Sequence, residues 1–270
     1  MNIYAISDLH VSHPQNRRVV EELPAHPSDW LVLAGDVGET PDHLEWTFDL
    51  LSKRFANLAW VPGNHELWTL PNDPVQLRGE PRYRYLVEMC RSMGVLSPED
   101  PYPLLDCDGF QFVLAPLFLL YDYTFRPPGV TRQEAMARAF KAGLTCSDEF
   151  LLHPDPYSGR AEWCHARVDW TAMRLRQIPE ALPLVMVSHF ALTRELAHLP
   201  LAPEFAIWCG TELTSEWHRL FRARIVIMGH LHTPKAQWKD GTRFEEVSLG
   251  YPHEWSRRAS PPTLRKIALG

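Results

Sequence analysis

The chain has 270 residues, of which 45% are hydrophobic and 22% charged, and its 33 acidic and 27 basic residues give a formal net charge of −6. This composition excludes a disordered chain, and the charge argues against a broad footprint on a polyanion such as duplex DNA, although bound cations would add positive charge at a site. The five cysteines form no CxxC pair, so neither a disulfide framework nor a cysteine zinc site is indicated.

The first sixty residues predict a β-α-β-α-β unit. Short apolar runs at 3–7, 30–34 and 58–61 are typical of buried strands. Between the last two, Thr40 and Pro41 indicate a helix start, and Leu44, Phe48, Leu51 and Phe55 follow at helical spacing. In open α/β sheets ligands bind at the carboxyl ends of such strands.

The middle of the chain, about 68–183, is rich in proline and predicts partly a continuation of the sheet and partly a cap-like insertion over the site. Asp108-Gly109 indicates a hairpin between 104–105 and 110–114. One helix begins at Thr131 with a capping box completed by Glu134, and another is expected near 161–178. We expect residues 1–270 to form a single domain that contains this insertion.

Strand-like runs return after this region, and their arrangement is expected to be more antiparallel. They lie at 184–187, 225–228, 236–238, 244–247 and 264–267, with a hairpin turn at Asp240-Gly241. No run approaches the length of a membrane span, and the first residues do not resemble a cleavable leader. We therefore expect a cytoplasmic protein without a membrane partner.

Five polar clusters follow apolar runs. They are Asp8-Leu9-His10, Gly35-Asp36-Val37-Gly38-Glu39, Gly63-Asn64-His65-Glu66, Ser188-His189 and Gly229-His230-Leu231-His232. Taken singly, each has an ordinary explanation as a turn, an N-cap or a satisfied core histidine. Their joint occurrence, each at a predicted strand end, points to one shared site.

The residue types in these clusters predict chemistry with two metals. Carboxylates and imidazoles together suit Mn, Fe or Zn better than Mg or Ca. Two cations about 3.5–4 Å apart can generate hydroxide from water and clamp both oxygens of an in-line displacement at phosphorus. His230 and His232 would face the same site if their segment were extended, because alternate side chains of a strand share a face.

In this order, the clusters resemble the signature of the calcineurin-like metallophosphoesterase superfamily: D-x-H, G-D, G-N-H-[DE], a lone H, and G-H-x-H. The match runs from Asp8 to His232, and every motif position is filled. The resemblance implies an α/β fold with α+β character, a four-layer sandwich of two mixed β-sheets flanked by helices. It places the metal centre at the carboxyl ends of strands.

The resemblance also implies the ligands of two divalent ions, whether Mn, Fe, Zn or Ni, with Mn expected to serve in vitro. The first ion would be held by Asp8, His10, Asp36 and His232, and the second by Asp36, Asn64, His189 and His230. Asp36 would then bridge the two ions. His65 matches the family's histidine that contacts the phosphate and protonates the leaving group, and Glu39 is favoured over Glu66 as the carboxylate that orients it.

Residues that contact the substrate carry a weaker signal. Asn16 and Arg17 follow the first cluster closely, while Tyr123, Arg126 and His253 are expected in loops near the site. A solvated helix face or ordinary packing explains these residues as well as substrate binding does.

The leading hypothesis is a hydrolase of phosphate esters, a phosphomonoesterase or phosphodiesterase in which metal-bound hydroxide attacks phosphorus in line. The acidic charge and the insertion favour a small phosphorylated metabolite or a nucleotide as substrate. The alternative is a nuclease, which predicts a basic groove, and 78–91 contains four arginines interrupted by glutamates. A non-catalytic scaffold is disfavoured because the ligand set is intact.

Overall fold

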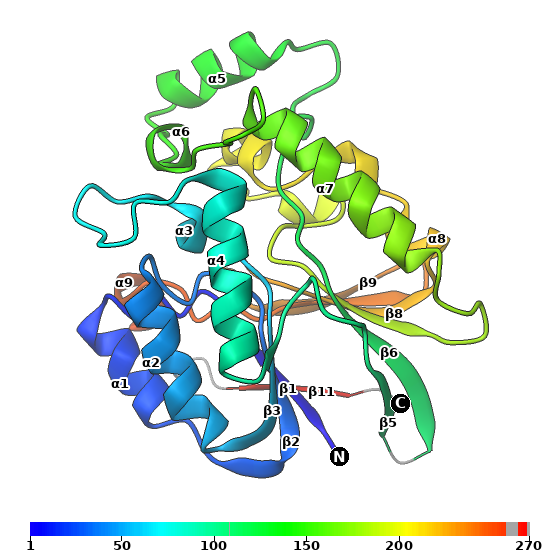
Figure 1. The fold of residues 1–270 in the computed structure, drawn as a ribbon. Coiled ribbons are helices and arrows are strands. Elements are labelled where there is room, and N and C mark those ends of the chain that lie inside the picture. The colour runs from blue at the N-terminus through cyan, green and yellow to red at the C-terminus, as the bar shows by residue number, and fades with distance from the viewer. Residues whose placement is uncertain (108, 258–263, 269–270) are drawn as a thin grey trace.

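The computed structural model describes residues 1–107, 109–257 and 264–268, and it consists of two mixed β-sheets packed face to face with helices on their outer faces (Figure 1). The first sheet has the strand order β11-β1-β2-β3-β4, and the second has the order β5-β6-β7-β8-β10-β9. This four-layer α/β sandwich is the fold that the family resemblance implied.

In the first sheet, the predicted β-α-β-α-β unit is confirmed. The strands β1 (Ile3–Ile6), β2 (His26–Leu33), β3 (Phe55–Trp60) and β4 (Val95–Leu96) are parallel, and β11 (Arg265–Ile267) pairs antiparallel with β1. The helices α1 (Pro14–Glu21) and α2 (Pro41–Ser52) connect the first three strands. The α2 helix ends before Phe55, which belongs to β3 and not to the helical face expected from its spacing.

The second sheet combines strands from the middle and the end of the chain. The strands β6 (Phe110–Pro116), β7 (Leu184–Val187), β8 (Ala223–Met228) and β10 (Thr242–Glu246) are parallel, and β5 (Leu104–Cys107) and β9 (Lys235–Lys239) pair antiparallel at the edges. Of the predicted Asp108-Gly109 turn, Asp108 lies outside the described residues. Asp240 and Gly241 both adopt the positive φ angles, 49° and 78°, that a tight hairpin turn requires.

Successive side chains of a strand point to opposite faces of its sheet, and this divides the buried hydrophobic residues into two groups. Ile3 and Ala5 of β1 point into the layer between the sheets, whereas Ile6 packs with the helices on the outside. Val185 and Met186 divide in the same way in β7. Because both faces are covered, the central strands are continuous apolar runs, which is why they were recognisable in the sequence.

The middle of the chain contributes both sheet strands and helices that lie away from the sheets. Figure 1 shows α5 and α6 above the carboxyl ends of the strands, with α4 and α7 alongside the sandwich. The remaining helices and turns are α3 (Asn64–Leu67), α4 (Gly79–Ser92), α5 (Arg132–Lys141), α6 (Asp148–Leu151), α7 (Arg160–Leu175), η1 (Arg194–Ala197), η2 (Pro203–Trp208), η3 (Glu212–Thr214), α8 (Trp217–Leu220) and α9 (Pro252–Trp255). The Thr131–Glu134 capping box is present at the start of α5.

Three of the four arginines of 78–91 belong to α4, a helix that the sequence analysis did not predict, and Arg78 directly precedes it. Arg82 is fully buried, where it donates to the Glu66 carbonyl and pairs with Asp73. Arg84 pairs with Glu80 and Glu99, and Arg91 pairs with Glu88 and Asp100. These three arginines therefore do not form the open basic groove that the nuclease hypothesis required.

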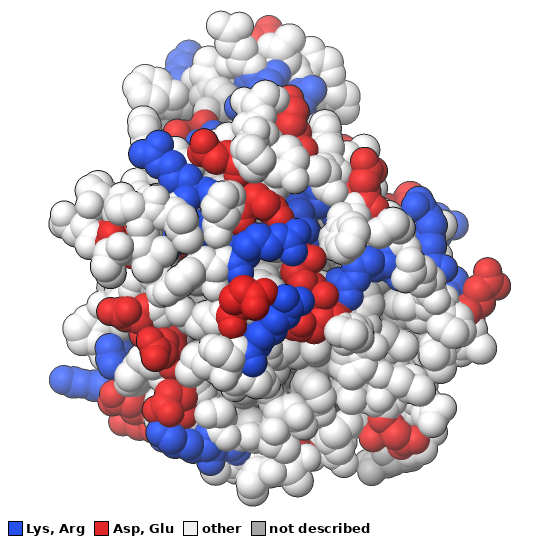
Figure 2. All heavy atoms as spheres, viewed as in Figure 1, with Lys and Arg blue, Asp and Glu red and all other residues white. Residues whose placement is uncertain are grey.

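Acidic and basic side chains alternate over the face seen in Figure 2, where red and blue atoms adjoin one another and no broad basic band is visible. None of the helices in the described part of the chain combines the length and the apolar character needed to cross a membrane.

Candidate metal centre

The candidate centre is formed where loops leave the carboxyl ends of β1, β2, β3, β7 and β8. Five residues there have left-handed backbone conformations, with positive φ angles: Asp8 (54°), His10 (41°), Asp36 (53°), His230 (71°) and His232 (52°). Each costs roughly 1–2 kcal/mol for a non-glycine residue, and such strain concentrates at functional sites. The His230–His232 segment is therefore not extended as expected, although both imidazoles still reach the centre.

One group of donors consists of Asp8, His10 and His232, whose ligand atoms all lie within 4.8 Å of one another. The Nε2 atom of His232 lies 3.1 Å from Oδ1 of Asp8 and 3.3 Å from Nε2 of His10. Asp8 and His10 follow β1 of the first sheet, whereas His232 follows β8 of the second. The two sheets meet here, and the backbone N–H of His230 donates to Oδ1 of Asp8 at 3.1 Å.

A second group consists of Asp36, His189 and His230, again within 4.8 Å. The Nε2 atom of His189 lies 3.4 Å from Oδ2 of Asp36 and 3.2 Å from Oδ1 of Asn64. The same Asp36 oxygen lies 4.0 Å from Nε2 of His10. Asp36 is therefore placed between the two groups, as a bridging ligand would be.

The donors fit divalent metal ions. The Nδ1 atom of His189 lies 2.9 Å from the Ala34 carbonyl oxygen and donates to it, so Nε2 faces Asp36 and Asn64. The Nε2 atom of His230 is buried and makes no hydrogen bond to any described residue. Burial and then the neighbouring His189 lower the pKa of His230 to about 3, so its imidazole is neutral and has a lone pair available for a metal ion.

Residues outside the sequence motif hold these ligands in place. Glu254 lies 2.7 Å from Nδ1 of His232, and the hydroxyls of Ser7 and Ser248 donate to Oδ2 of Asp8 at 2.5 and 2.7 Å. Ser7 directly precedes the first motif residue, but the positions of Glu254 and Ser248 gave no sequence signal. Ser248 follows β10 and reaches the loop after β1, and Glu254 lies in α9 and reaches the loop after β8, so both contacts depend on the tertiary structure.

Glycine is required beside Asp36. A Cβ atom on Gly63 would lie 2.1 Å from Oδ1 of Asp36 and 2.6 Å from its backbone nitrogen. In addition, the backbone N–H of His65 donates to Oδ1 of Asp36 at 2.9 Å. The Gly63-Asn64-His65 motif thus lets the third loop approach the second loop closely enough to position the central carboxylate.

His65 lies next to the two ligand groups, with Nε2 3.8 Å from Oδ2 of Asp36. Its Nδ1 atom is 3.3 Å from Oε1 of Glu39, the carboxylate favoured from the sequence. Glu66 instead accepts the backbone N–H groups of Asp36, Val37 and Gly63 and ties the two loops together. Although burial opposes protonation, Asp36 and Glu39 raise the pKa of His65 above its ordinary value.

Comparison with known proteins identifies the family. The model of the calcineurin-like phosphoesterase family matches residues 1–234. The chain belongs to that family. It is therefore a metallophosphoesterase, and the donors described above are able to bind the divalent metals that such enzymes use.

Within the calcineurin-like phosphoesterases, the chain is similar over nearly its whole length to one curated protein. It is 49% identical over 267 residues to the [acyl-carrier-protein] phosphodiesterase PptH of Mycobacterium tuberculosis, and this match covers 98% of this chain and 82% of the relative. The crystal structure of the phosphopantetheinyl hydrolase PptH from the same organism matches with a TM-score of 0.96 and 48% identity, covering 100% of this chain and 96% of that one. TT1561 of Thermus thermophilus shares the fold, with a TM-score of 0.50 and 13% identity over 92% of this chain and 88% of that one.

A recess of about 330 Å³ opens onto the phosphoesterase centre. Besides the ligands, it is lined by Trp68, by residues 145–147 of the middle region, by Leu199 and Phe205, and by Tyr251. The Tyr251 ring stacks on His10 with their centroids 4.5 Å apart. The opening is therefore framed by aromatic side chains and by the segment that precedes α6.

The five residues expected to contact substrate do not line this recess. Asn16 is buried, and its amide group bonds to Leu9, Gly250 and Trp255. Arg17 packs over the Trp46 ring, and the Tyr123 hydroxyl, also buried, donates to Glu149. Arg126 donates to the carbonyls of Val130 and Tyr123, and the His253 ring stacks on that of Tyr251 with their centroids 5.8 Å apart. Each of these side chains thus has packing or hydrogen-bond partners within the protein, and a role in substrate binding stays a prediction.

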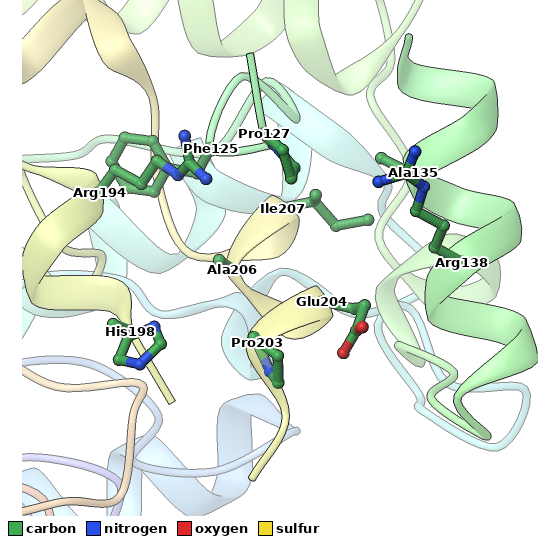
Figure 3. Close-up of a pocket in the computed structure, with 10 residues that line it drawn as sticks. All are labelled: Phe125, Pro127, Ala135, Arg138, Arg194, His198, Pro203, Glu204, Ala206 and Ile207. Atoms are coloured by element: carbon green, nitrogen blue, oxygen red, sulfur yellow. The ribbon is translucent and has the colours of Figure 1, made fainter. Parts of the chain in front are cut away.

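A second cavity, of about 350 Å³, lies between α5 and η2 (Figure 3). The η2 segment forms a wall common to both cavities, because Ala206 and Ile207 line this one whereas Phe205 lines the recess and lies beside His230. Its lining contains none of the motif residues of the phosphoesterase family.

Proposed function

We propose that this protein is a binuclear metal-dependent phosphodiesterase that hydrolyses the bond joining a phosphopantetheinyl group to an acyl carrier protein. The observation that carries the proposal is the 49% identity to the acyl-carrier-protein phosphodiesterase over 98% of this chain. The aligned 98% of the chain spans both the metal-ligand motifs and the middle region that frames the recess.

Seven side chains would hold two divalent ions, with Asp36 shared between them. Asp8, His10 and His232 would complete the site of the first ion, and Asn64, His189 and His230 that of the second. When bound, such a pair lowers the pKa of a coordinated water and stabilises charge on the attacking and leaving oxygens. The mixed imidazole and carboxylate donors favour Mn, Fe, Zn or Ni.

His65 would act as the general acid. The Nδ1 atom of its ring lies beside Glu39, which leaves Nε2 on the side of Asp36 and the two ligand groups. From there Nε2 can give its proton to the oxygen that leaves phosphorus, which in this reaction is the hydroxyl oxygen of the carrier protein. Protonation matters because an unprotonated alkoxide is a poor leaving group.

A small phosphodiester is the second candidate substrate, favoured by the limited volume of the recess. A space of about 330 Å³ accommodates the phosphate and the adjoining part of a chain, but not a folded protein. A carrier protein would therefore remain outside and present its prosthetic group at the opening. The same geometry would accept a nucleotide or a phosphorylated metabolite that has a diester bond.

The test is hydrolysis by protein that has been stripped of metal and refilled with Mn²⁺. A carrier protein bearing its phosphopantetheinyl group is incubated with the enzyme and followed by intact-protein mass spectrometry, beside bis-p-nitrophenyl phosphate and p-nitrophenyl phosphate. The expected result is loss of the phosphopantetheinyl group and cleavage of the diester in preference to the monoester. A carrier protein that stays intact while small diesters are cleaved would favour the second candidate, and cleavage of the monoester alone would overturn both.

A further inference from the structure

A buried carboxylate from the middle region reaches the candidate metal centre. Asp148 begins α6 and has no exposed surface. Its Oδ1 atom accepts a hydrogen bond from Nδ2 of Asn64 at 2.9 Å and another from Nε1 of Trp68 at 2.7 Å. The carboxyl group of Asp148 is thus enclosed beside the ligands, and Asp148 lies 84 residues from Asn64 in the chain.

The bond to Asp148 determines which way the Asn64 amide faces. An asparagine side chain carries one acceptor and one donor group on the same carbon, and only the oxygen can bind a cation. Since Nδ2 is turned to Asp148, Oδ1 is turned to the opposite side, where it lies 3.2 Å from Nε2 of His189. Rotating the amide by half a turn would direct its NH₂ group toward the ligand group of His189 and Asp36.

The hydrogen bond between Asp148 and Trp68 also affects the surroundings of His65. The Trp68 ring, held at its Nε1 by Asp148, lies on the His65 imidazole with their centroids 3.6 Å apart and their planes at 32°. One carboxylate oxygen therefore contacts the side chain of a candidate ligand and also the residue that packs against the candidate acid.

The position of Asp148 depends in turn on the middle region. Its carbonyl accepts from the guanidinium of Arg160 and from the backbone N–H of Leu152. The backbone N–H of Thr69 donates to the Leu151 carbonyl at 3.0 Å, which attaches α6 to the segment that follows α3. The carboxylate consequently reaches Asn64 only when α6 is packed against the α3 loop.

We propose that Asp148 is a positioning residue that orients Asn64 for metal binding, so that the second metal site is complete only when the middle region is packed in place. This inference rests on the metal site assigned in the proposed function. Loss of such an outer carboxylate lowers metal affinity about 10–100-fold in well-studied sites.

The experiment compares Asp148→Ala, Asp148→Asn and Glu149→Ala in metal-stripped protein. Glu149 is the matched control because it belongs to the same helix and accepts hydrogen bonds from Tyr123, Trp208 and Arg160. Among the described residues, none of these partners is a candidate metal ligand. Mn²⁺ affinity and stoichiometry are measured by titration, and the melting temperature is measured without metal. We expect Asp148→Ala to lower the affinity for one of the two Mn²⁺ ions about 10–100-fold.

Asp148→Asn should restore most of that affinity, because its amide oxygen can still accept from Asn64. Glu149→Ala should lower the melting temperature without altering Mn²⁺ affinity. If Asp148→Ala does not fold, Asp148→Leu fills the same space without an acceptor and serves as the same test. Wild-type Mn²⁺ affinity in the acceptor-free variant would overturn the role of Asp148 while leaving the proposed function intact, whereas a wild-type protein that binds no Mn²⁺ would overturn the metal assignment itself.

Discussion

The carboxylate of Glu254 lies 2.7 Å from Nδ1 of His232, while the other ring nitrogen of that imidazole lies 3.1 Å from Asp8. The histidine is thus held between two carboxylates on opposite sides of its ring. Such a partner fixes the tautomer and the direction of the ring, and it raises the basicity of the nitrogen that would bind metal. The same Glu254 oxygen accepts the Tyr251 backbone N–H, so α9 is anchored where it meets the ligand.

Glu254→Ala is therefore expected to lower metal affinity about 10–100-fold. Glu254→Gln, whose amide oxygen can still accept a hydrogen bond from Nδ1–H of His232, should lose less affinity. Isothermal titration of the metal-free protein with Mn²⁺ measures both. The control is Glu195→Ala, since that carboxylate is 70% exposed, pairs with Lys239 and does not line the recess at the centre. Equal affinities for Glu254→Ala and wild type would rule out the assigned role.

His65→Ala should retain its metal ions and lose turnover. The side chain is expected to supply a proton and not a ligand, and general acids contribute roughly 10²–10⁴-fold to the rate. Metal content by elemental analysis and kcat on bis-p-nitrophenyl phosphate are determined on the same sample. Asp36→Asn is the contrasting variant, because it alters the shared ligand and should lose both metal and activity. A His65→Ala protein that turns over at the wild-type rate would exclude the acid role.

Gly63→Ala should disrupt the centre although it adds only a methyl group. The new carbon would lie 2.1 Å from Oδ1 of Asp36 and must displace either that carboxylate or the loop. We expect loss of at least one bound metal together with activity. Gly143→Ala is a suitable comparison, because its φ of 78° makes alanine unfavourable by about 1–2 kcal/mol, but its Cβ would meet nothing within 4 Å. Gly143→Ala should have a lower melting temperature and keep both metals.

Glu99 is expected to stabilise the fold in a pH-dependent way. Its side chain, 4% exposed, pairs with Arg167 and Arg84 and accepts from the Tyr83 hydroxyl. Although burial opposes ionisation, Arg167 leads the groups that lower the pKa of Glu99. A carboxyl whose pKa is lowered by folding stabilises the protein above its unfolded pKa, about 4.3 for glutamate. This contribution disappears as the pH falls through the folded value.

Glu99→Gln should accordingly reduce the free energy of unfolding by about 1–3 kcal/mol at pH 7, and the difference from wild type should shrink below about pH 4. Urea denaturation across that range provides the measurement. Glu88→Gln is the control, because Glu88 is 70% exposed and its pair with Arg91 should contribute no more than about 1 kcal/mol. A constant difference at every pH would show that the charge of Glu99 is not responsible.

Much of the candidate centre was predictable from the sequence because its ligands are linked to local features. Asp8, Asp36 and Asn64 each follow an apolar strand, and the carboxyl ends of parallel strands meet at one edge of a sheet. Order along the chain and the position after a strand were therefore sufficient to expect a shared site. Glu39 could also be chosen over Glu66, although that choice depended on resemblance to a family.

The residues that support the ligands could not be found in this way. Asp148 and Glu254 contact Asn64 and His232 only because α6 and α9 pack against the centre, and neither lies within a motif. Conversely, arginines that looked like a basic stretch in the sequence are paired within the fold. Arg82 of α4, for example, is buried and donates to the Glu66 carbonyl. By itself, then, the sequence determined the fold class, the family and the candidate ligands, because strand periodicity and motif spacing are local. Only the tertiary structure decided which carboxylates orient those ligands and which polar residues are occupied by packing, because such contacts join segments whose separation along the chain leaves no periodic signal.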